Sequence, residues 1–121
     1  MSFSAEELTA IARTAEVSIE TRAPEGPVHK TVIWAVVDGD ETFVRSWRGP
    51  KARWYREALA NPAVALFIED RRLTATAIPA TDPDSIERTS AAFLRKYAGD
   101  PAAKSMTRPE ILSTTLRLEP A

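Results

Sequence analysis

The chain has 121 residues, of which 44% are hydrophobic and 27% are charged, a composition typical of one soluble globular domain. Sixteen Lys and Arg against seventeen Asp and Glu give a formal net charge of -1, which argues against a nucleic-acid-binding protein held by its overall field. The absence of cysteine and the single histidine, His29, exclude disulfides, thiolate chemistry and a multi-histidine zinc site, so no metal is expected.

The N-terminal segment predicts a helix within residues 1–15. Ser4 and Glu7 have the spacing of a capping box, and Phe3 and Leu8 occupy the staple positions beside it. No secretory signal pattern precedes this helix, and no apolar run reaches the roughly 18 residues that a membrane span needs. We therefore expect a cytoplasmic protein without a membrane partner.

A strand, a loop and a hairpin are predicted next. Residues 17–21 alternate between apolar and polar, as in a half-buried strand, and residues 23–28 hold two prolines and a glycine, as in a loop. Residues 30–37 are mostly β-branched or aromatic, which predicts one continuous strand buried on both faces. Asp38-Gly39-Asp40 predicts a tight turn into a returning strand over residues 42–47.

The second half of the chain continues the mixed pattern. A helix over residues 52–60 is followed by predicted strands over 64–69 and 72–78. Asp82 and Pro83 are an N-cap and first-turn pair for the longest helix, so the acids there have a structural explanation without a metal. Phe93, Leu94 and Tyr97 are interpreted as its core side chains.

A last alternating strand is predicted over residues 112–118. The complete pattern predicts a single α+β domain over residues 1–121, in which six mostly antiparallel strands with flanking helices curl into a small barrel.

One basic and aromatic segment is the candidate functional site. Residues 45–56 read R-S-W-R-G-P-K-A-R-W-Y-R and hold five cations, no acid and three aromatic residues. A strand end, a Gly-Pro loop and a helix start in this order offer backbone N–H groups and cations to a phosphate, and the aromatic rings can stack a flat ligand. The alternative is a solvated basic face, with Trp54 and Tyr55 anchoring the helix in the core.

The sequence T-F-V-R-S-W-R-G-P-K-A-R-W-Y-R-E-A-L-A-N-P-A-V-A-L resembles the central segment of flavin-binding split β-barrels. This superfamily includes the pyridoxamine 5'-phosphate oxidase-like proteins and the deazaflavin-dependent nitroreductases. From about residue 16 onward, the chain looks most like a small bacterial domain-of-unknown-function family on the same barrel. The resemblance implies a split β-barrel, FMN or a deazaflavin as cofactor, and a homodimer with the cofactor near the subunit boundary.

The resemblance also implies roles for particular residues. Ser46 and Lys51 would contact the cofactor phosphate with help from Arg45 or Arg48, and residues 30–34 would run under the ring. Trp54 and Tyr55 would lie at the cofactor edge or in the helix packing. The residues assigned to the cofactor site are therefore Lys30, Arg45, Ser46, Arg48, Gly49, Lys51, Trp54 and Tyr55.

Three functions follow, in decreasing order of preference. The first is a flavin- or deazaflavin-dependent oxidoreductase, in which the cofactor supplies the chemistry. The second is a non-catalytic binding module for a phosphorylated or aromatic small ligand, and the third is nucleic-acid binding by residues 45–56. No catalytic residue is identified: His29 is expected to lie exposed in its loop, and its alternative role is that of a proton donor.

Overall fold

A computed structural model describes residues 2–121, and Met1, the first residue of the predicted N-terminal helical range, lies outside the described residues. The elements are α1 (Ala5–Arg13), β1 (Val17–Arg22), β2 (Val28–Ile33), β3 (Ala35–Asp38), β4 (Glu41–Val44), η1 (Gly49–Lys51), α2 (Arg53–Ala60), β5 (Ala63–Ile68), β6 (Arg71–Pro79), α3 (Pro83–Lys96), α4 (Ala102–Ser105), η2 (Pro109–Thr114) and β7 (Leu116–Pro120). The predicted α+β class is confirmed.

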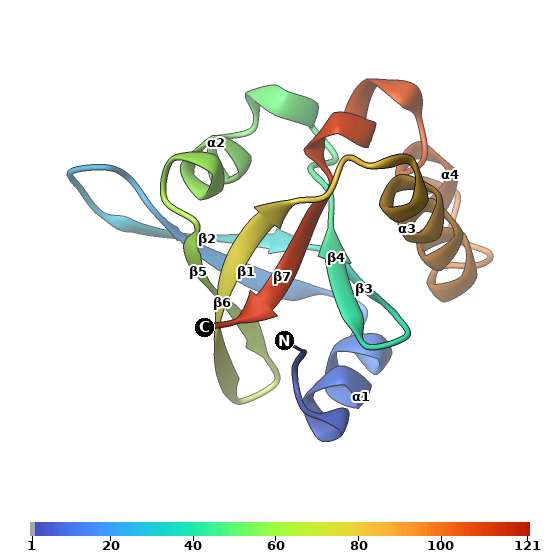
Figure 1. Ribbon diagram of the computed structural model, residues 1–121, viewed down its shortest axis with the longest axis horizontal. Helices are drawn as coiled ribbons and strands as arrows, with labels where there is room; N and C mark the ends of the chain where they lie inside the picture. Colours follow the sequence, from blue (N-terminus) through green and yellow to red (C-terminus); the bar gives the residue numbers. More distant parts are fainter. Residues whose placement is uncertain (1) are drawn as a thin grey trace.

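The strands form one antiparallel sheet in the order β2-β1-β5-β6-β7-β4-β3. The sheet curls into a half-barrel with helices around it (Figure 1). Chain connectivity explains the curl, because β2 and β3 occupy opposite edges of the sheet although only Trp34 separates them in sequence.

The predicted continuous strand over residues 30–37 is wrong. It divides at Trp34 into β2 and β3, which gives seven strands where six were expected. Nor is β2 buried on both faces: the side chains of Lys30 and Val32 are exposed, and Val32 is 63% accessible. A run of β-branched residues signals extended backbone but does not show where that backbone changes its pairing partner.

Two other expectations are corrected. The last strand begins at Leu116, and residues 109–114 form the 3₁₀ helix η2 in its place. Leu94 is 46% exposed, whereas Phe93 and Tyr97 are buried as predicted. Since α3 packs on the sheet along one stripe only, Leu94 falls beside that stripe.

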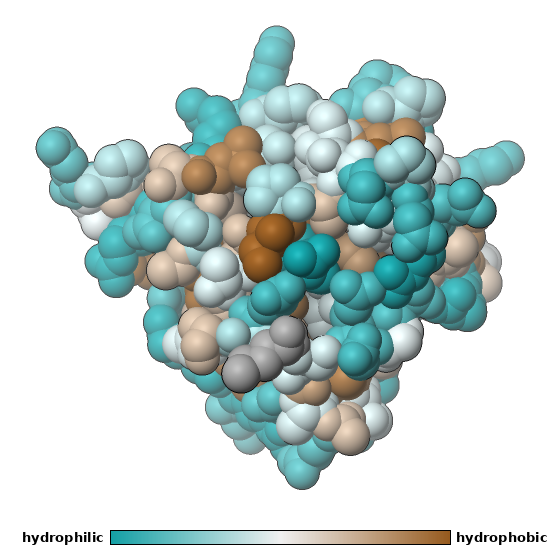
Figure 2. Space-filling view, in the orientation of Figure 1, coloured by the Kyte–Doolittle hydropathy of each residue, from teal (hydrophilic) through white to brown (hydrophobic). Residues whose placement is uncertain are grey.

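Two apolar cores hold the helices to the sheet. The first fills the curl and includes side chains of α1 and α2, among them Ile11, Trp54 and Ala58. The second packs α3, α4 and η2 against Val36 and Phe43 of the β3–β4 hairpin. On the face seen in Figure 2, apolar side chains form small separate patches among hydrophilic ones. Within residues 2–121, no helix is long and apolar enough to span a membrane.

Local caps set the ends of the helices as the sequence predicts. At α1 the Ser4 side chain accepts from the Glu7 N–H at 3.1 Å, and the Glu7 carboxylate accepts from the Ser4 N–H at 2.9 Å. At α3 Asp82 accepts from the Ser85 N–H at 3.0 Å. This bond is the largest cause of the lowered pKa of Asp82, so the cap explains that acid.

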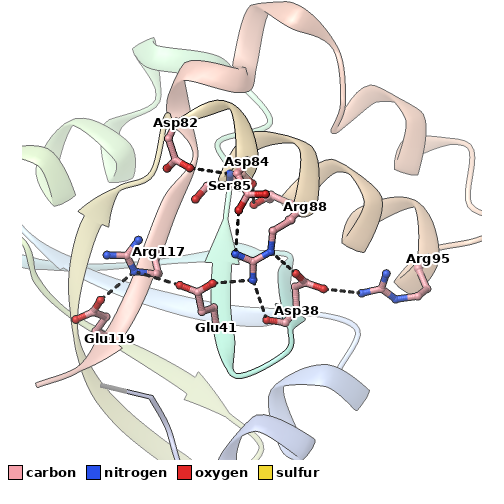
Figure 3. Close-up of polar contacts among 10 residues, drawn as sticks. Asp38, Glu41, Asp82, Asp84, Ser85, Arg88, Arg95, Arg117 and Glu119 are labelled. Carbon is pink, nitrogen blue, oxygen red and sulfur yellow. Dashed lines mark hydrogen bonds and ion pairs between the residues drawn. The ribbon is translucent and has the colours of Figure 1, made fainter.

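A network of ion pairs fastens α3 to the β3–β4 hairpin and to β7 (Figure 3). Arg88 lies 2.6 Å from Asp38 and 2.7 Å from Glu41. Arg117 lies 2.9 Å from Glu119 and 3.8 Å from Glu41. Hydrogen bonds to Asp38 and Glu41 raise the pKa of Arg88, so its charge belongs to this network.

Candidate functional site

The segment of residues 45–56 follows β4 and contains η1 and the start of α2. It borders a cavity of about 320 Å³ whose other walls come from β2, Trp34 and α4. The lining is mainly apolar and includes three tryptophans, Trp34, Trp47 and Trp54. The remaining lining residues are Glu16, Thr31, Val32, Ile33, Arg45, Arg48, Ala52, Ala102 and Met106.

Separate contacts hold the three tryptophans. The ring of Trp34 stacks on Tyr97 with 3.7 Å between centroids and 7° between planes. Trp47 is 55% exposed, yet its indole N–H donates to the Ser105 hydroxyl at 3.0 Å and the Arg108 guanidinium lies 5.4 Å from its ring centroid. Trp54 is only 5% exposed. The aromatic walls are therefore positioned before a ligand binds.

A wider basic groove adjoins the cavity and shares five lining residues with it, Thr31, Val32, Arg48, Ala52 and Trp54. Its volume is about 810 Å³. Four exposed cations line it, and no acid of the described residues does; the cations are Arg48, Lys51, Arg53 and Arg56. None of the four forms an ion pair within residues 2–121.

The start of α2 opens at the same groove. Its N-cap residue, Ala52, supplies no side-chain hydrogen bond, so the first N–H groups of the helix lack a side-chain acceptor. These donors and the adjoining cations form an environment that favours an anion.

Ser46 and Gly49 shape the loop from inside. The Ser46 hydroxyl is fully buried and donates to the Gly49 carbonyl at 2.7 Å, and the Ser46 N–H donates to the Thr114 hydroxyl at 3.0 Å. Gly49 has φ of +82°, a conformation that side-chain-bearing residues rarely adopt. In this arrangement both residues fix the turn that carries Lys51, and neither lines the groove.

Arg45 lines the inner cavity but is 1% exposed. Its guanidinium donates to two hydroxyls and two carbonyls, those of Thr115, Ser90, Met106 and Ile86. Burial lowers the pKa of Arg45 to about 10, so the group remains cationic at neutral pH.

Three other predicted residues lie outside the cavity and the groove. Lys30 points to the Phe67 ring, with 3.6 Å between its ammonium and the ring centroid. The Tyr55 hydroxyl donates to the Ser113 carbonyl at 3.3 Å, and its ring packs edge-on against Trp54. His29 lies on β2 and is half-buried, so the expectation of an exposed loop residue is wrong.

His29 contacts a buried carboxylate of α2. Its Nδ1 atom lies 3.0 Å from Glu57 Oε2, and the Thr21 hydroxyl donates to Glu57 Oε1 at 2.8 Å. Burial by itself would raise the pKa of Glu57. The hydrogen bonds from Thr21 and His29, with the electrostatic interactions of Glu57 with His29 and Arg53, outweigh burial and lower it. This cluster joins the β1–β2 hairpin to the helix that borders the groove.

Arg48, Lys51 and Trp54, which the sequence assigns to a cofactor site, line the cleft that the cavity and the groove form together. Distant segments contribute further wall residues that the sequence does not predict. Glu16, Ala102 and Met106 reach the cavity through the fold, and no local pattern marks them. Arg53 and Arg56 belong to the predicted segment, where their spacing on one helix face was an available signal. No group of three His, Asp or Glu side chains within residues 2–121 is placed to hold a metal ion.

The curled antiparallel sheet, the flanking helices and the lateral cleft define the class of split-barrel proteins. A solved structure of HutZ, the heme storage protein from Vibrio cholerae, matches 100% of this chain and 92% of its own, with a TM-score of 0.73 and 17% identity. A putative pyridoxamine 5'-phosphate oxidase from Listeria innocua matches 95% of this chain and 90% of its own, with a TM-score of 0.68 and 14% identity.

A NimC/NimA family protein from Clostridium acetobutylicum matches 96% of this chain and 78% of its own, with a TM-score of 0.68 and 15% identity. At these identities the likeness shows the fold alone. The chain itself belongs to the bacterial family described as "Uncharacterized protein conserved in bacteria (DUF2255)", whose model matches residues 7–118. The predicted split-barrel fold and the predicted resemblance to a small bacterial family of unknown function are thus confirmed. No curated protein matches the chain in sequence.

Proposed function

We propose that the protein binds a flat aromatic cofactor with an anionic tail, FMN or a deazaflavin, and acts as an oxidoreductase. One observation supports this most strongly: a cavity lined by three tryptophans opens beside a groove with four cations that have no carboxylate partner among the described residues. A phosphorylated ring system fits both parts of this cleft, with its ring in the cavity and its phosphate in the groove.

The groove would hold the phosphate. Lys51 and Arg48 are the two cations assigned from the sequence that line it, and Arg53 and Arg56 extend the same charge along α2. Charge-assisted bonds from these side chains and from the helix N-terminus are the strongest contacts that this region offers. Ser46 contributes indirectly in this proposal, by fixing the turn before Lys51.

The cavity would hold the ring. Trp34, Trp47 and Trp54 offer it aromatic surfaces, and the cavity volume of about 320 Å³ is within the usual size of a small-ligand pocket. When bound, a flavin or deazaflavin supplies hydride transfer, while the chain binds and orients it and sets the electrostatics around it.

A specific observation supports the second candidate, a non-catalytic binding module. Among the described lining residues of the cavity and groove, Glu16 is the only acid and no histidine is present. The fold is shared with HutZ, a heme storage protein, so ligand storage without turnover is the alternative on this barrel. Binding of FMN without faster electron transfer from NADPH to a quinone would favour this module.

We also propose a homodimer. The edge strand β2 exposes Val28 and Val32, and Val32 lies at the cleft, so a second subunit at this edge would cover apolar surface beside the ligand. One structural neighbour, matched with 20% identity over 87% of this chain, is a domain-swapped dimer. Sedimentation velocity measures the oligomeric state directly.

The deciding experiment is a titration of the purified protein with FMN and with the deazaflavin cofactor, followed by quenching of tryptophan fluorescence. We expect saturable binding that weakens with added salt and that is much weaker for riboflavin, which lacks the phosphate. Lys51→Glu replaces an attractive charge by a repulsive one and is expected to weaken FMN binding by about tenfold or more.

Lys104→Glu is the matched control, because it makes the same charge change at an exposed lysine that does not line the cavity or the groove. Its FMN affinity should equal that of the wild type. Equal losses in the two variants would mean that net charge, and not the groove, governs binding. Absence of binding to both cofactors would reject the proposed function.

A further inference from the structure

Arg45 is a buried charge without a counter-ion. Its Nε donates to Thr115 Oγ1 at 2.7 Å and its Nη2 to the Ile86 carbonyl at 2.8 Å. Its Nη1 donates to Ser90 Oγ at 2.8 Å and to the Met106 carbonyl at 3.0 Å. All four acceptors are neutral, and Arg45 takes part in no ion pair within residues 2–121.

Neutral acceptors satisfy the N–H groups of Arg45 but do not cancel its charge. A buried charge without a compensating carboxylate is costly, and most buried ions are paired. Because the surrounding walls are mainly apolar, the field of the guanidinium is screened less than it would be in water. The inner cavity, which Arg45 lines, therefore has a positive potential from a group that solvent does not reach.

The other charged groups at the cavity differ from Arg45 in their exposure. Glu16 and Arg48 also line it, but both side chains are exposed, so water and salt weaken their fields. Their opposite charges also offset each other. The buried guanidinium, which contacts the cavity-lining residue Met106 through its carbonyl, is thus the charge at the cavity wall that solvent screens least.

We propose that the cavity selects the anionic form of an acidic aromatic ligand, with Arg45 as the specificity-determining charge. This inference rests on the proposed function in one respect, that the cavity accepts an aromatic ring. The ligand class comprises phenolates and ring imides that lose a proton, and for a flavin the same field favours the negatively charged reduced ring over the neutral oxidised one. The phosphate groove is not required.

A phenol with a visible proton equilibrium tests this directly. 4-Nitrophenol changes its absorbance when it ionises, so the pKa of the bound molecule can be read from a pH titration at saturating protein. We expect the phenolate to bind at least about tenfold more tightly than the phenol, which lowers the pKa of the bound probe by about one unit or more relative to the free probe.

Three variants assign the source of the shift. Arg45→Gln removes the charge and is expected to abolish the preference for phenolate, whereas Arg45→Lys keeps the charge and retains the preference. The double variant Lys51→Glu/Arg53→Glu changes the groove alone and should retain it as well. If Arg45→Gln does not fold, salt decides: a preference due to the buried charge persists from about 0.01 M to about 1 M salt, and one due to the exposed groove cations disappears.

Some results would overturn the inference. These are no binding of 4-nitrophenol, an unchanged or raised pKa of the bound probe, and loss of the shift in the groove double variant or at high salt. The FMN titration stays independent of this outcome. Phenolate selection without FMN binding would reject the cofactor proposal and keep the charge selection, and FMN binding without phenolate selection would do the opposite.

Discussion

The arginines of two regions of this molecule have opposite surroundings. At the α3 side, Arg88 lies within 3.5 Å of Asp38, Glu41 and Asp84, and Arg117 lies near Glu41 and Glu119 (Figure 3). At the cleft, the five cations of residues 45–56 have no carboxylate within ion-pair distance in the described chain.

This difference distinguishes arginines that stabilise the fold from cations that are available to a ligand. Where acids surround the arginines, the positive charges are already paired, and the ion pairs hold α3 to the sheet. Where cations stand without acids, like charges repel one another and the fold gains no ion-pair stabilisation from them. The charges of the exposed cations are therefore available to an anion from outside, which is why the cleft and not the network is the candidate site.

The largest expected effect is a loss of stability on replacing Trp54, and a comparison with Trp47 separates folding from ligand binding within the cleft. Trp54 is 5% exposed and belongs to the first core, so Trp54→Ala should lower the free energy of unfolding by about 3–5 kcal/mol in urea denaturation. Trp47 is 55% exposed, so Trp47→Ala should cost about 1 kcal/mol or less while weakening FMN binding by about tenfold. A Trp54→Ala protein of normal stability that fails to bind FMN would move Trp54 from the core to the ligand.

A smaller effect on stability is expected from the ion-pair network, and it can be compared with a matched change in the groove. Arg88→Met leaves Asp38 and Glu41 without their main partner and should lower the free energy of unfolding by about 1–2 kcal/mol, with unchanged FMN affinity. Lys51→Met is the matched change in the groove and should reduce FMN binding without loss of stability. If the two variants exchanged these phenotypes, the distinction between paired and unpaired cations would have no functional meaning.

The smallest expected effect concerns Glu57, which is paired although it lies beside the groove. Its pKa is below the ordinary value in the folded state, so its carboxylate stabilises the fold above the unfolded pKa of about 4.3. This contribution is lost as the pH falls through the lower folded value. Glu57→Gln should therefore cost about 1 kcal/mol at about pH 7 and little at about pH 3.

Urea unfolding at the two pH values checks this prediction, with His29→Gln as the companion variant that removes one hydrogen-bond partner of Glu57. An equal loss at both pH values would show that packing, and not the charge of Glu57, joins the β1–β2 hairpin to α2.

The sequence predicts those features that neighbouring residues determine. The capping box of Ser4 and Glu7, the N-cap of Asp82 and the turn at Gly39 each depend on residues within a few positions, and all are found as expected. The basic and aromatic segment is also visible, because five cations and three aromatic residues stand within twelve positions. The same segment does not reveal which members face a ligand, since that depends on the elements packed around it.

The sequence by itself therefore determined the α+β class, most of the elements and the segment that borders the cleft. Only the tertiary structure decided that β2 and β3 separate at Trp34, that Ser46 is buried within its turn, and that Arg45 is buried at the cavity wall with neutral partners. The physical reason is the range of the interactions. Caps, turns and periodicity are local, whereas strand pairing, burial and the presence of a counter-ion depend on residues far apart in the sequence, as with the 70 positions between Arg45 and Thr115.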